Sequence, residues 1–232
     1  MQSSPKTGLA LFDLDHTLIP FDSDYSWGEF TSTVLGWNDP DDFRRRNDAF
    51  YADYKAGTLD IHAYCRFATA SIVRQGPQAA RAAHARYMQD VVQKGILPQA
   101  LELVRRHQQA GDTVVIITAT NEFVTRPIAG LFGVQELLAI ELETAPLADG
   151  TPWYTGEIRG VPSFREGKVT RLEHWMAARG LNWDNVDTTF YSDSINDVPL
   201  LERSRVPVAT NPDDRLRALA QERAWRILDL FA

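Results

Sequence analysis

Hydrophobic and polar residues follow two different periods along this chain of 232 residues. Residues 9–13 are almost continuously apolar, which is typical of a strand buried on both faces in a parallel sheet. From residue 23 to residue 94 the apolar positions recur at helical spacing, without a strand candidate. From Pro98 onward, helical segments alternate with short apolar runs. The pattern therefore predicts a sheet with a group of helices inserted after its first strand.

Capping and turn residues divide the inserted region into several helices. Asp39 followed by Pro40 predicts a helix start, and Gly57 predicts its end. The Gly76-Pro77 pair interrupts a later helix. Apolar residues of the first helix share one face: Trp27, Phe30 and Val34.

Strand candidates in the second half lie between helical segments. They span residues 113–118, 188–192, 206–209 and 226–228. Residues 137–143 and 153–159 flank Asp149-Gly150 and predict a hairpin. Alternating strands and helices indicate an α/β fold, in which a parallel sheet carries helices on both faces. Ligands of such sheets bind beyond the carboxyl ends of the strands.

Composition narrows the classes of partner. The chain has 24 Lys and Arg against 31 Asp and Glu, a formal net charge of −7, which argues against nucleic acid and anionic membranes as partners. A single cysteine, Cys65, excludes an internal disulfide. The sequence shows neither a secretion signal nor an apolar run of membrane-spanning length, so we expect a cytoplasmic protein.

The first polar cluster follows the first predicted strand. Asp13 and Asp15 lie two residues apart, and holding two like charges together is costly unless a cation or a shared proton compensates them. Asp13 could attack phosphorus as a nucleophile, and Asp15 could protonate the leaving group and then activate water. Thr17 could fix the loop through its hydroxyl. Turn or capping residues are the alternative interpretation of this cluster.

A second cluster follows the strand at 188–192. Asp193 could bind Mg²⁺, which prefers carboxylates, water and phosphate oxygens. Asp197 could hold a metal-bound water or orient its neighbours, and Asn196 could donate to phosphate. A capped turn would also explain these residues.

Two further positions complete the candidate phosphate site. The hydroxyl of Thr118 and the following backbone N–H groups, beginning with Ala119, could hold a phosphate oxygen. Lys168, near the start of a predicted helix, could neutralise nucleophile and phosphate together. An ordinary helix cap at Thr118 and a solvated lysine at 168 are the alternatives.

Together, the segments D-L-D-H-T-L, Thr118, Lys168 and S-D-S-I-N-D resemble, in order, the four motifs of the haloacid dehalogenase superfamily of phosphohydrolases. The resemblance implies a Rossmann-like core, with Asp13 as nucleophile and Asp15 as acid and base. It also implies Mg²⁺ held by Asp13, the backbone carbonyl of Asp15, and Asp193. Ser192 and Ser194 depart from this pattern, because many members have glycines there.

The helical insert resembles the cap of the phosphoserine-phosphatase-like branch, whose bacterial members include some histidinol-phosphatases. We therefore expect a core of residues 1–20 and 96–232 and a cap of residues 21–95. Asp22 falls where phosphoserine phosphatases bind the substrate amine, although it could equally cap the following helix. We expect a small, amine-bearing phosphate ester as substrate, such as phosphoserine or histidinol phosphate, and a monomer or homodimer.

Two features of the insert bear on that choice. No arginine of the insert can be matched to the one that phosphoserine phosphatases use for the serine carboxylate; the candidates are Arg44, Arg45, Arg46, Arg66 and Arg74. Four aromatic residues could contact an imidazole ring or belong to the helical core: Tyr25, Trp27, Phe50 and Tyr54. Alternative functions are phosphotransfer through the same aspartyl-phosphate, or phosphate binding without catalysis.

Overall fold

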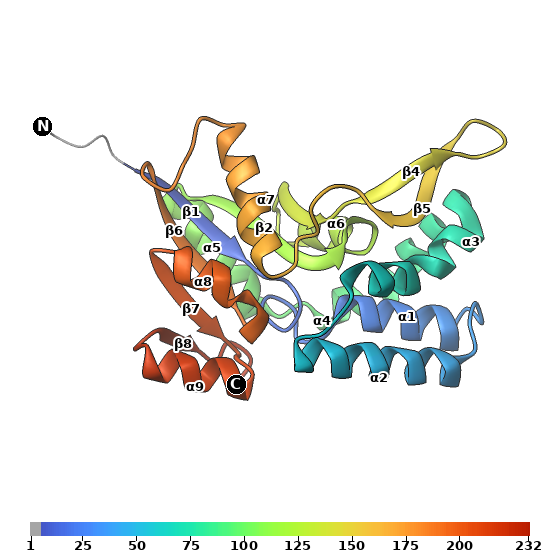
Figure 1. The fold of residues 1–232 in the computed structure, drawn as a ribbon, viewed down its shortest axis with the longest axis horizontal. Coiled ribbons are helices and arrows are strands. Elements are labelled where there is room, and N and C mark those ends of the chain that lie inside the picture. The colour runs from blue at the N-terminus through green and yellow to red at the C-terminus, as the bar shows by residue number, and fades with distance from the viewer. Residues whose placement is uncertain (1–5) are drawn as a thin grey trace, which may run out of the picture.

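The computed structural model describes residues 6–232 (Figure 1). The strands are β1 (Thr7–Phe12), β2 (Thr113–Asn121), β3 (Glu136–Ile140), β4 (Leu142–Pro146), β5 (Pro152–Ile158), β6 (Val186–Ser192), β7 (Val206–Thr210) and β8 (Arg226–Leu228). The helices are α1 (Ser23–Thr33), α2 (Pro40–Ala56), α3 (Ile61–Tyr87), α4 (Gln93–Gly95), α5 (Pro98–Ala110), α6 (Glu122–Leu131), α7 (Glu166–Ala177), α8 (Val198–Arg203) and α9 (Asp214–Glu222). A π-helical turn, η1 (Met88–Val92), continues α3, and a 3₁₀ turn, η2 (Ile195–Asp197), precedes α8.

Six parallel strands form the main sheet in the order β3-β2-β1-β6-β7-β8. The first strand of the chain lies in the middle, where Leu11 pairs with Val115 of β2 on one side and with Phe190 of β6 on the other. The chain builds one half of the sheet outward from β1 and then returns to build the other half. This reversal places β1 and β6 side by side, and in such sheets the reversal point is the usual site of ligand binding.

Successive residues of β1 contact opposite layers of helices, as the pleat of a strand requires. Ala10 and Phe12 belong to a buried cluster that includes residues of α5 and α6. Leu9 and Leu11 belong to a second cluster with residues of α7, α8 and α9. The prediction of an α/β fold with a parallel sheet covered on both faces is confirmed.

The helices between Ser23 and Gly95 lie beside the sheet rather than on it (Figure 1). Asp39 caps α2 by accepting from the backbone N–H of Asp42, and Gly57 ends this helix with a left-handed φ of 78°. Gly76, with φ 76° and ψ 175°, kinks α3 where the sequence predicted an interruption. Val34 does not extend the helical face of Trp27 and Phe30, because α1 ends at Thr33 and Val34 is 48% exposed.

The predicted hairpin needs a correction as well. Residues 137–143 are not one strand, because Glu136–Ile140 forms β3 at the edge of the main sheet, parallel to β2. Leu142–Pro146 forms a separate strand, β4, which pairs antiparallel with β5. The largely apolar sequence of residues 137–143 could not reveal that the chain changes sheets at Glu141. The resulting hairpin reaches over α3, against which β5 packs (Figure 1).

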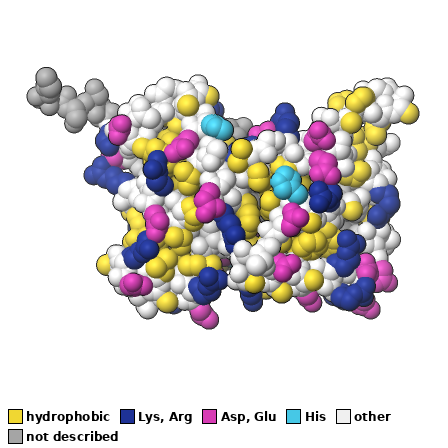
Figure 2. Space-filling model, in the orientation of Figure 1, with side chains coloured by type: hydrophobic (Ala, Val, Ile, Leu, Met, Phe, Trp, Pro, Cys, Tyr) yellow, Lys and Arg dark blue, Asp and Glu magenta, His cyan; other side chains and the backbone are white. Residues whose placement is uncertain are grey.

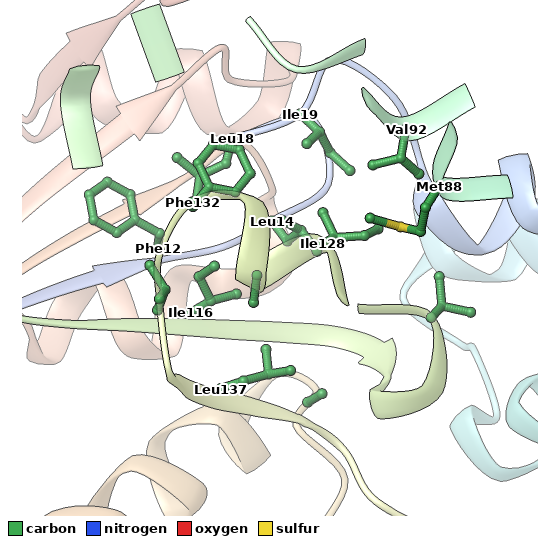
Figure 3. Packing of buried hydrophobic residues seen from close by; sticks show 14 of the residues in the cluster. Phe12, Leu14, Leu18, Ile19, Met88, Val92, Ile116, Ile128, Phe132 and Leu137 are labelled. Atoms are coloured by element: carbon green, nitrogen blue, oxygen red, sulfur yellow. The ribbon is translucent and has the colours of Figure 1, made fainter. Parts of the chain in front are cut away.

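One hydrophobic cluster joins the helical region, which comprises the helices between Ser23 and Gly95, to the main sheet and its helices. Met88 and Val92 of η1 lie beside Ile19, in the loop that follows β1, and Ile128 of α6 (Figure 3). The cluster then continues to Phe12 of the central strand. Burial of such side chains contributes about 1.5–3 kcal/mol each, so the helical region is fastened by apolar packing.

Charged side chains of both signs are interspersed on the face shown in Figure 2. Ion pairs between exposed or partly exposed side chains include Arg44 with Glu29 and Arg203 with Glu173. Among residues 6–232, no helix is long and apolar enough to cross a membrane.

Candidate active site

Two candidate motifs meet where the central strands end. Asp13 directly follows β1 and Asp193 directly follows β6, and these two strands are neighbours. The backbone N–H of Asp13 still donates to the carbonyl of Tyr191 (2.9 Å), which continues the ladder to the loops. The rigid sheet therefore positions the first and fourth motifs against each other.

Lys168 connects the carboxylates of both motifs. Its ammonium donates to Asp13 Oδ1 at 2.7 Å and to Asp197 Oδ2 at 2.6 Å, and its side chain is 2% exposed. Burial alone would lower the pKa of Lys168, but the attraction of Asp13 and Asp197 outweighs it and raises the pKa overall. Lys168 is therefore a fixed, charged group, and not the solvated surface lysine considered as the alternative.

Asp13 and Asp193 lie close to the same hydroxyl. Thr17 Oγ1 is 3.5 Å from Asp13 Oδ2 and 3.4 Å from Asp193 Oδ1. Burial raises the pKa of Asp13 to about 7, against the lowering effect of Lys168, and burial together with the Asp13 charge raises the pKa of Asp193 well above its ordinary value. The Lys168 ammonium thus lies among three carboxylates, of which those of Asp13 and Asp197 are buried and that of Asp193 is partly buried, and the site carries an excess of negative charge.

Both carboxylate oxygens of Asp15 are held by the protein. Oδ1 accepts from the backbone N–H of Ser23 at 2.9 Å, and Oδ2 accepts from Thr120 Oγ1 at 2.8 Å. Burial, followed by repulsion from Asp22, raises the pKa of Asp15 to about 6. The sequence gives no signal for these two contacts of Asp15, because Ser23 and Thr120 lie in other segments and only the folded chain brings them to it.

Thr118 shapes the end of β2. Its buried hydroxyl accepts from the backbone N–H of Thr120 at 3.1 Å, and Ala119 lines the cavity next to it. The alternative that Thr118 caps a helix is wrong, because the side chain of Asn121 caps α6.

The loop after β6 is braced from within. Asp197 Oδ2 accepts from Ser192 Oγ at 2.6 Å as well as from Lys168, so this carboxylate is already engaged by two protein donors. Asn196 Oδ1 accepts from Arg165 Nε at 3.2 Å, whereas its Nδ2 group is buried without a hydrogen-bond partner. Asn196 therefore retains a free donor within the loop that follows β6.

A cavity of about 200 Å³ opens above these carboxylates. Asp13, Asp15 and Asp193 contribute to its lining from the sheet side. The facing wall comes from α2, the start of α3 and the loop before α7, and it is rich in aromatic side chains: Phe50, Tyr51, Tyr54, Tyr64 and Phe164. Tyr25 and Trp27 are not among the lining residues, and Trp27 is instead 1% exposed within the core.

Asp22 both caps a helix and lines the cavity. Its Oδ1 accepts from the backbone N–H of Tyr25 at 2.9 Å and caps α1, and its side chain also lines the cavity. None of the five arginines proposed for a substrate carboxylate lines the cavity. Arg44 pairs with Glu29, and Arg66 pairs with Glu157. The remaining three contact other groups of the helical region: Arg45, Arg46 and Arg74.

The donor set at this edge fits a hard divalent cation. In residues 6–232, no group of three or more His, Cys, Asp or Glu side chains is arranged to hold a metal. Two carboxylates, those of Asp13 and Asp193, nevertheless flank one hydroxyl in a site with excess negative charge. Oxygen donors of this kind suit Mg²⁺, which retains water and takes few protein ligands.

Comparison with known proteins agrees with this geometry. The model of the haloacid dehalogenase-like hydrolases matches residues 10–202, and the chain belongs to this family. Within the family it is a phosphatase of the phosphoserine-phosphatase-like branch, a relationship that two curated relatives support.

Histidinol-phosphatase of Neisseria meningitidis is 41% identical over 95% of this chain and 98% of its own length. Phosphoserine phosphatase SerB1 of Mycobacterium tuberculosis is 32% identical over 96% of this chain and 71% of its own. A protein of unknown function from Bordetella pertussis has a TM-score of 0.89 at 46% identity, covering 97% of this chain and 100% of its own. A substrate-bound phosphoserine phosphatase, with a TM-score of 0.65 at 16% identity over 98% of this chain and 94% of its own, shares the fold.

Proposed function

We propose that this phosphatase hydrolyses a small, amine-bearing phosphate monoester of the histidinol-phosphate type, through an aspartyl-phosphate at Asp13 and with Mg²⁺. The observation that carries the proposal is the buried Asp13–Lys168–Asp197 ion-pair network beneath a cavity with acidic and aromatic walls. Phosphoryl transfer needs an aligned nucleophile and positive charge near the phosphate oxygens, and this network supplies both.

In the first step, a carboxylate oxygen of Asp13 forms a bond to phosphorus while the bond from phosphorus to the ester oxygen breaks. Asp15 donates its proton to the departing alkoxide, and its pKa of about 6 suits a group that must both give and take a proton. In the second step, Asp15 takes a proton from water, whose oxygen attacks phosphorus and releases Asp13 and inorganic phosphate.

Other residues hold the phosphoryl group and the ion. Lys168 keeps Asp13 oriented and counters the negative charge, and the buried N–H groups of Asn196 supply free donors. Asp13, Asp193 and the backbone carbonyl of Asp15 would hold Mg²⁺. When bound, this ion supplies positive charge that neutralises nucleophile and phosphate oxygens. Thr118 and Ala119 would contribute to phosphate binding at the end of β2.

The cavity favours a cationic, ring-bearing substrate. Asp22 adds negative charge to its wall, while Phe50 and Tyr54 offer ring faces to which an imidazole can pack. No arginine is among the described residues that line it, so phosphoserine would lack the usual partner for its carboxylate. Lys55 is the lining residue that could replace an arginine, and its ammonium lies 4.4 Å from the centre of the Tyr51 ring.

We also propose that residues 21–95 act as a cap on a core of residues 1–20 and 96–232. Three observations support this division: the helical elements fill this range, the cavity lies between α2 and the strand ends, and the range begins and ends beside the sheet. A cap of this kind excludes bulk water while the aspartyl-phosphate forms.

Phosphate release from a panel of esters tests the proposal. The panel contains histidinol phosphate, phosphoserine, a sugar phosphate and a nucleotide, each with Mg²⁺ and with excess EDTA, and without added acceptor. We expect Mg²⁺-dependent release, fastest from histidinol phosphate. Equal rates in EDTA would overturn the metal dependence. Loss of the substrate's phosphoryl group only when an alcohol acceptor is present, with formation of the alcohol's phosphate ester instead of inorganic phosphate, would show a phosphotransferase.

Substrate choice has its own control within the panel. If phosphoserine proves the better substrate, Lys55→Met should raise its KM and leave that of histidinol phosphate unchanged, since only phosphoserine carries a carboxylate. A preference for phosphoserine that survives Lys55→Met would contradict our interpretation of the cavity wall.

A further inference from the structure

A hydrogen bond links the helical region to the loop of residues 192–197, which follows β6. The hydroxyls of Tyr54, near the end of α2, and Ser194 lie 2.6 Å apart. Ser194 is buried, and it follows Asp193 directly. A residue of the proposed cap therefore contacts the segment that carries the candidate metal ligand.

Ser194 also forms two hydrogen bonds within the loop. Its hydroxyl accepts from the backbone N–H of Asn196, and its own backbone N–H donates to Ser192 Oγ, both at 3.2 Å. Ser192 Oγ in turn donates to Asp197 Oδ2 at 2.6 Å. Because Asp197 also binds Lys168, a continuous chain of hydrogen bonds leads from Tyr54 toward the nucleophile. Each of the two serine contacts requires a hydroxyl, which a glycine in its place would lack.

Further contacts seat the end of α2 against the core. Arg215 donates to the backbone carbonyl of Lys55 at 2.9 Å, and the ring of Tyr54 lies 6.2 Å from that of Phe164. These contacts position α2 over the cavity without reaching the loop of residues 192–197. The Tyr54 hydroxyl adds a link to that loop, and it is the polar tip of a side chain that also forms part of the cavity wall.

We propose that Tyr54 and Ser194 are a positioning pair for the phosphatase reaction, which holds the loop of residues 192–197 in its reactive arrangement while α2 lies against the core. This role rests on the proposed function. When α2 moves away to admit substrate, the hydrogen bond breaks and the loop loses this restraint. Catalysis is thereby coupled to the position of the helix that closes the cavity.

Kinetics of Tyr54→Phe, Ser194→Ala and the double variant test the pair. A neutral hydrogen bond changes a rate by roughly 3- to 10-fold, so each single variant should lower kcat by about this factor with little change in KM. The double variant should be no slower than the singles, because either change already removes the same bond. Tyr25→Phe is the matched control: it removes a hydroxyl outside the cavity, and kcat should be unchanged.

A second readout separates positioning from general loss of structure. Urea unfolding of the same variants measures the coupling between the two residues in stability. A pair that only stabilises the fold would show coupling in unfolding and none in kcat. We expect the larger coupling in kcat. Unchanged kcat in both singles, multiplying effects in the double variant, or a rise confined to KM would each overturn the proposal. The assay uses whichever ester the wild type hydrolyses, so an inactive wild type refutes the proposed function itself, whereas an active wild type with uncoupled variants refutes only the pair.

Discussion

The two walls of the cavity are built in opposite ways. On the sheet side, buried carboxylates and one ammonium are held by short hydrogen bonds, such as that from Lys168 to Asp197 at 2.6 Å. On the α2 side, the wall is mainly aromatic, and Tyr51 remains 50% exposed. The Tyr54–Ser194 contact is a polar link between them.

This difference suits the two walls to different tasks: the sheet side to the chemical reaction, and the α2 side to the choice of substrate. Groups that take part in bond making must keep their geometry, so they follow parallel strands whose register is fixed by backbone pairing. Groups that choose among substrates need shape and apolar surface, which a helix face supplies and which substitutions can change without disturbing the sheet. Changes on the two sides should therefore have different consequences, and the following predictions are ordered from the largest expected effect.

Asp13→Asn should abolish the reaction on the sheet side. Loss of a nucleophile lowers kcat by about 10⁴-fold or more. An amide of the same shape should keep the fold, because its carbonyl oxygen can still accept from Lys168. Phosphate release measures the loss, and circular dichroism checks the fold. If the variant retains turnover within about 10-fold of the wild-type rate, Asp13 is not the nucleophile.

Lys168→Met should destabilise the protein strongly. Removing the ammonium leaves Asp13 and Asp197 buried without their cation, and breaking a buried ion pair costs about 3–5 kcal/mol. Urea unfolding measures the free energy. Arg203→Met is the control, because its pair with Glu173 is exposed and should contribute less than about 1 kcal/mol. Equal losses in the two variants would mean that the catalytic network adds no special stability.

Asp22→Asn should alter selection while sparing the fold. Asparagine caps helices about as well as aspartate, so α1 should keep its start, but the negative charge in the cavity is lost. KM for an amine-bearing ester should rise roughly 10-fold, since hydrogen bonds to charged groups are the stronger ones. KM for an amine-free ester should not change. Asp39→Asn, which alters the cap of α2, should change neither; equal KM shifts on both esters for Asp22→Asn would contradict amine recognition.

The smallest effect concerns pH and the packing between α3 and α6. Burial lowers the pKa of His84, whose Nε2 group lies 3.1 Å from the carbonyl of Val124. The folded state therefore holds the neutral imidazole, whereas the unfolded chain takes up a proton below about pH 6.5. The contribution of His84 to stability should be full above that pH and be lost as the pH falls toward its lowered folded pKa.

His84→Gln tests this dependence, because it keeps a side-chain N–H donor but does not titrate. We compare the urea concentration at half unfolding at about pH 7.5 and about pH 5.5. The change between the two pH values should be smaller in the variant than in the wild type. An identical difference in both proteins would show that His84 does not contribute to the pH dependence.

The sequence alone determined the features that depend on neighbouring residues. Capping residues such as Asp39 act within one turn of helix, and Gly57 and Gly76 act through their own φ angles, so their effects could be predicted locally. The order of the polar clusters after apolar runs likewise indicated that Asp13 and Asp193 follow strands. The resemblance to the phosphohydrolases then implied a role for each polar group.

Contacts between distant segments were decided only by the tertiary structure. Periodicity could not show that β1 lies between β2 and β6, that Ser23 and Thr120 hold Asp15, or that residues 137–143 divide between two sheets. It also placed Val34 on the face of a helix that ends one residue earlier. Local pattern determines which face of an element is apolar, because helices and strands repeat over a few residues. Which polar groups meet in a buried site depends on how all the elements pack together.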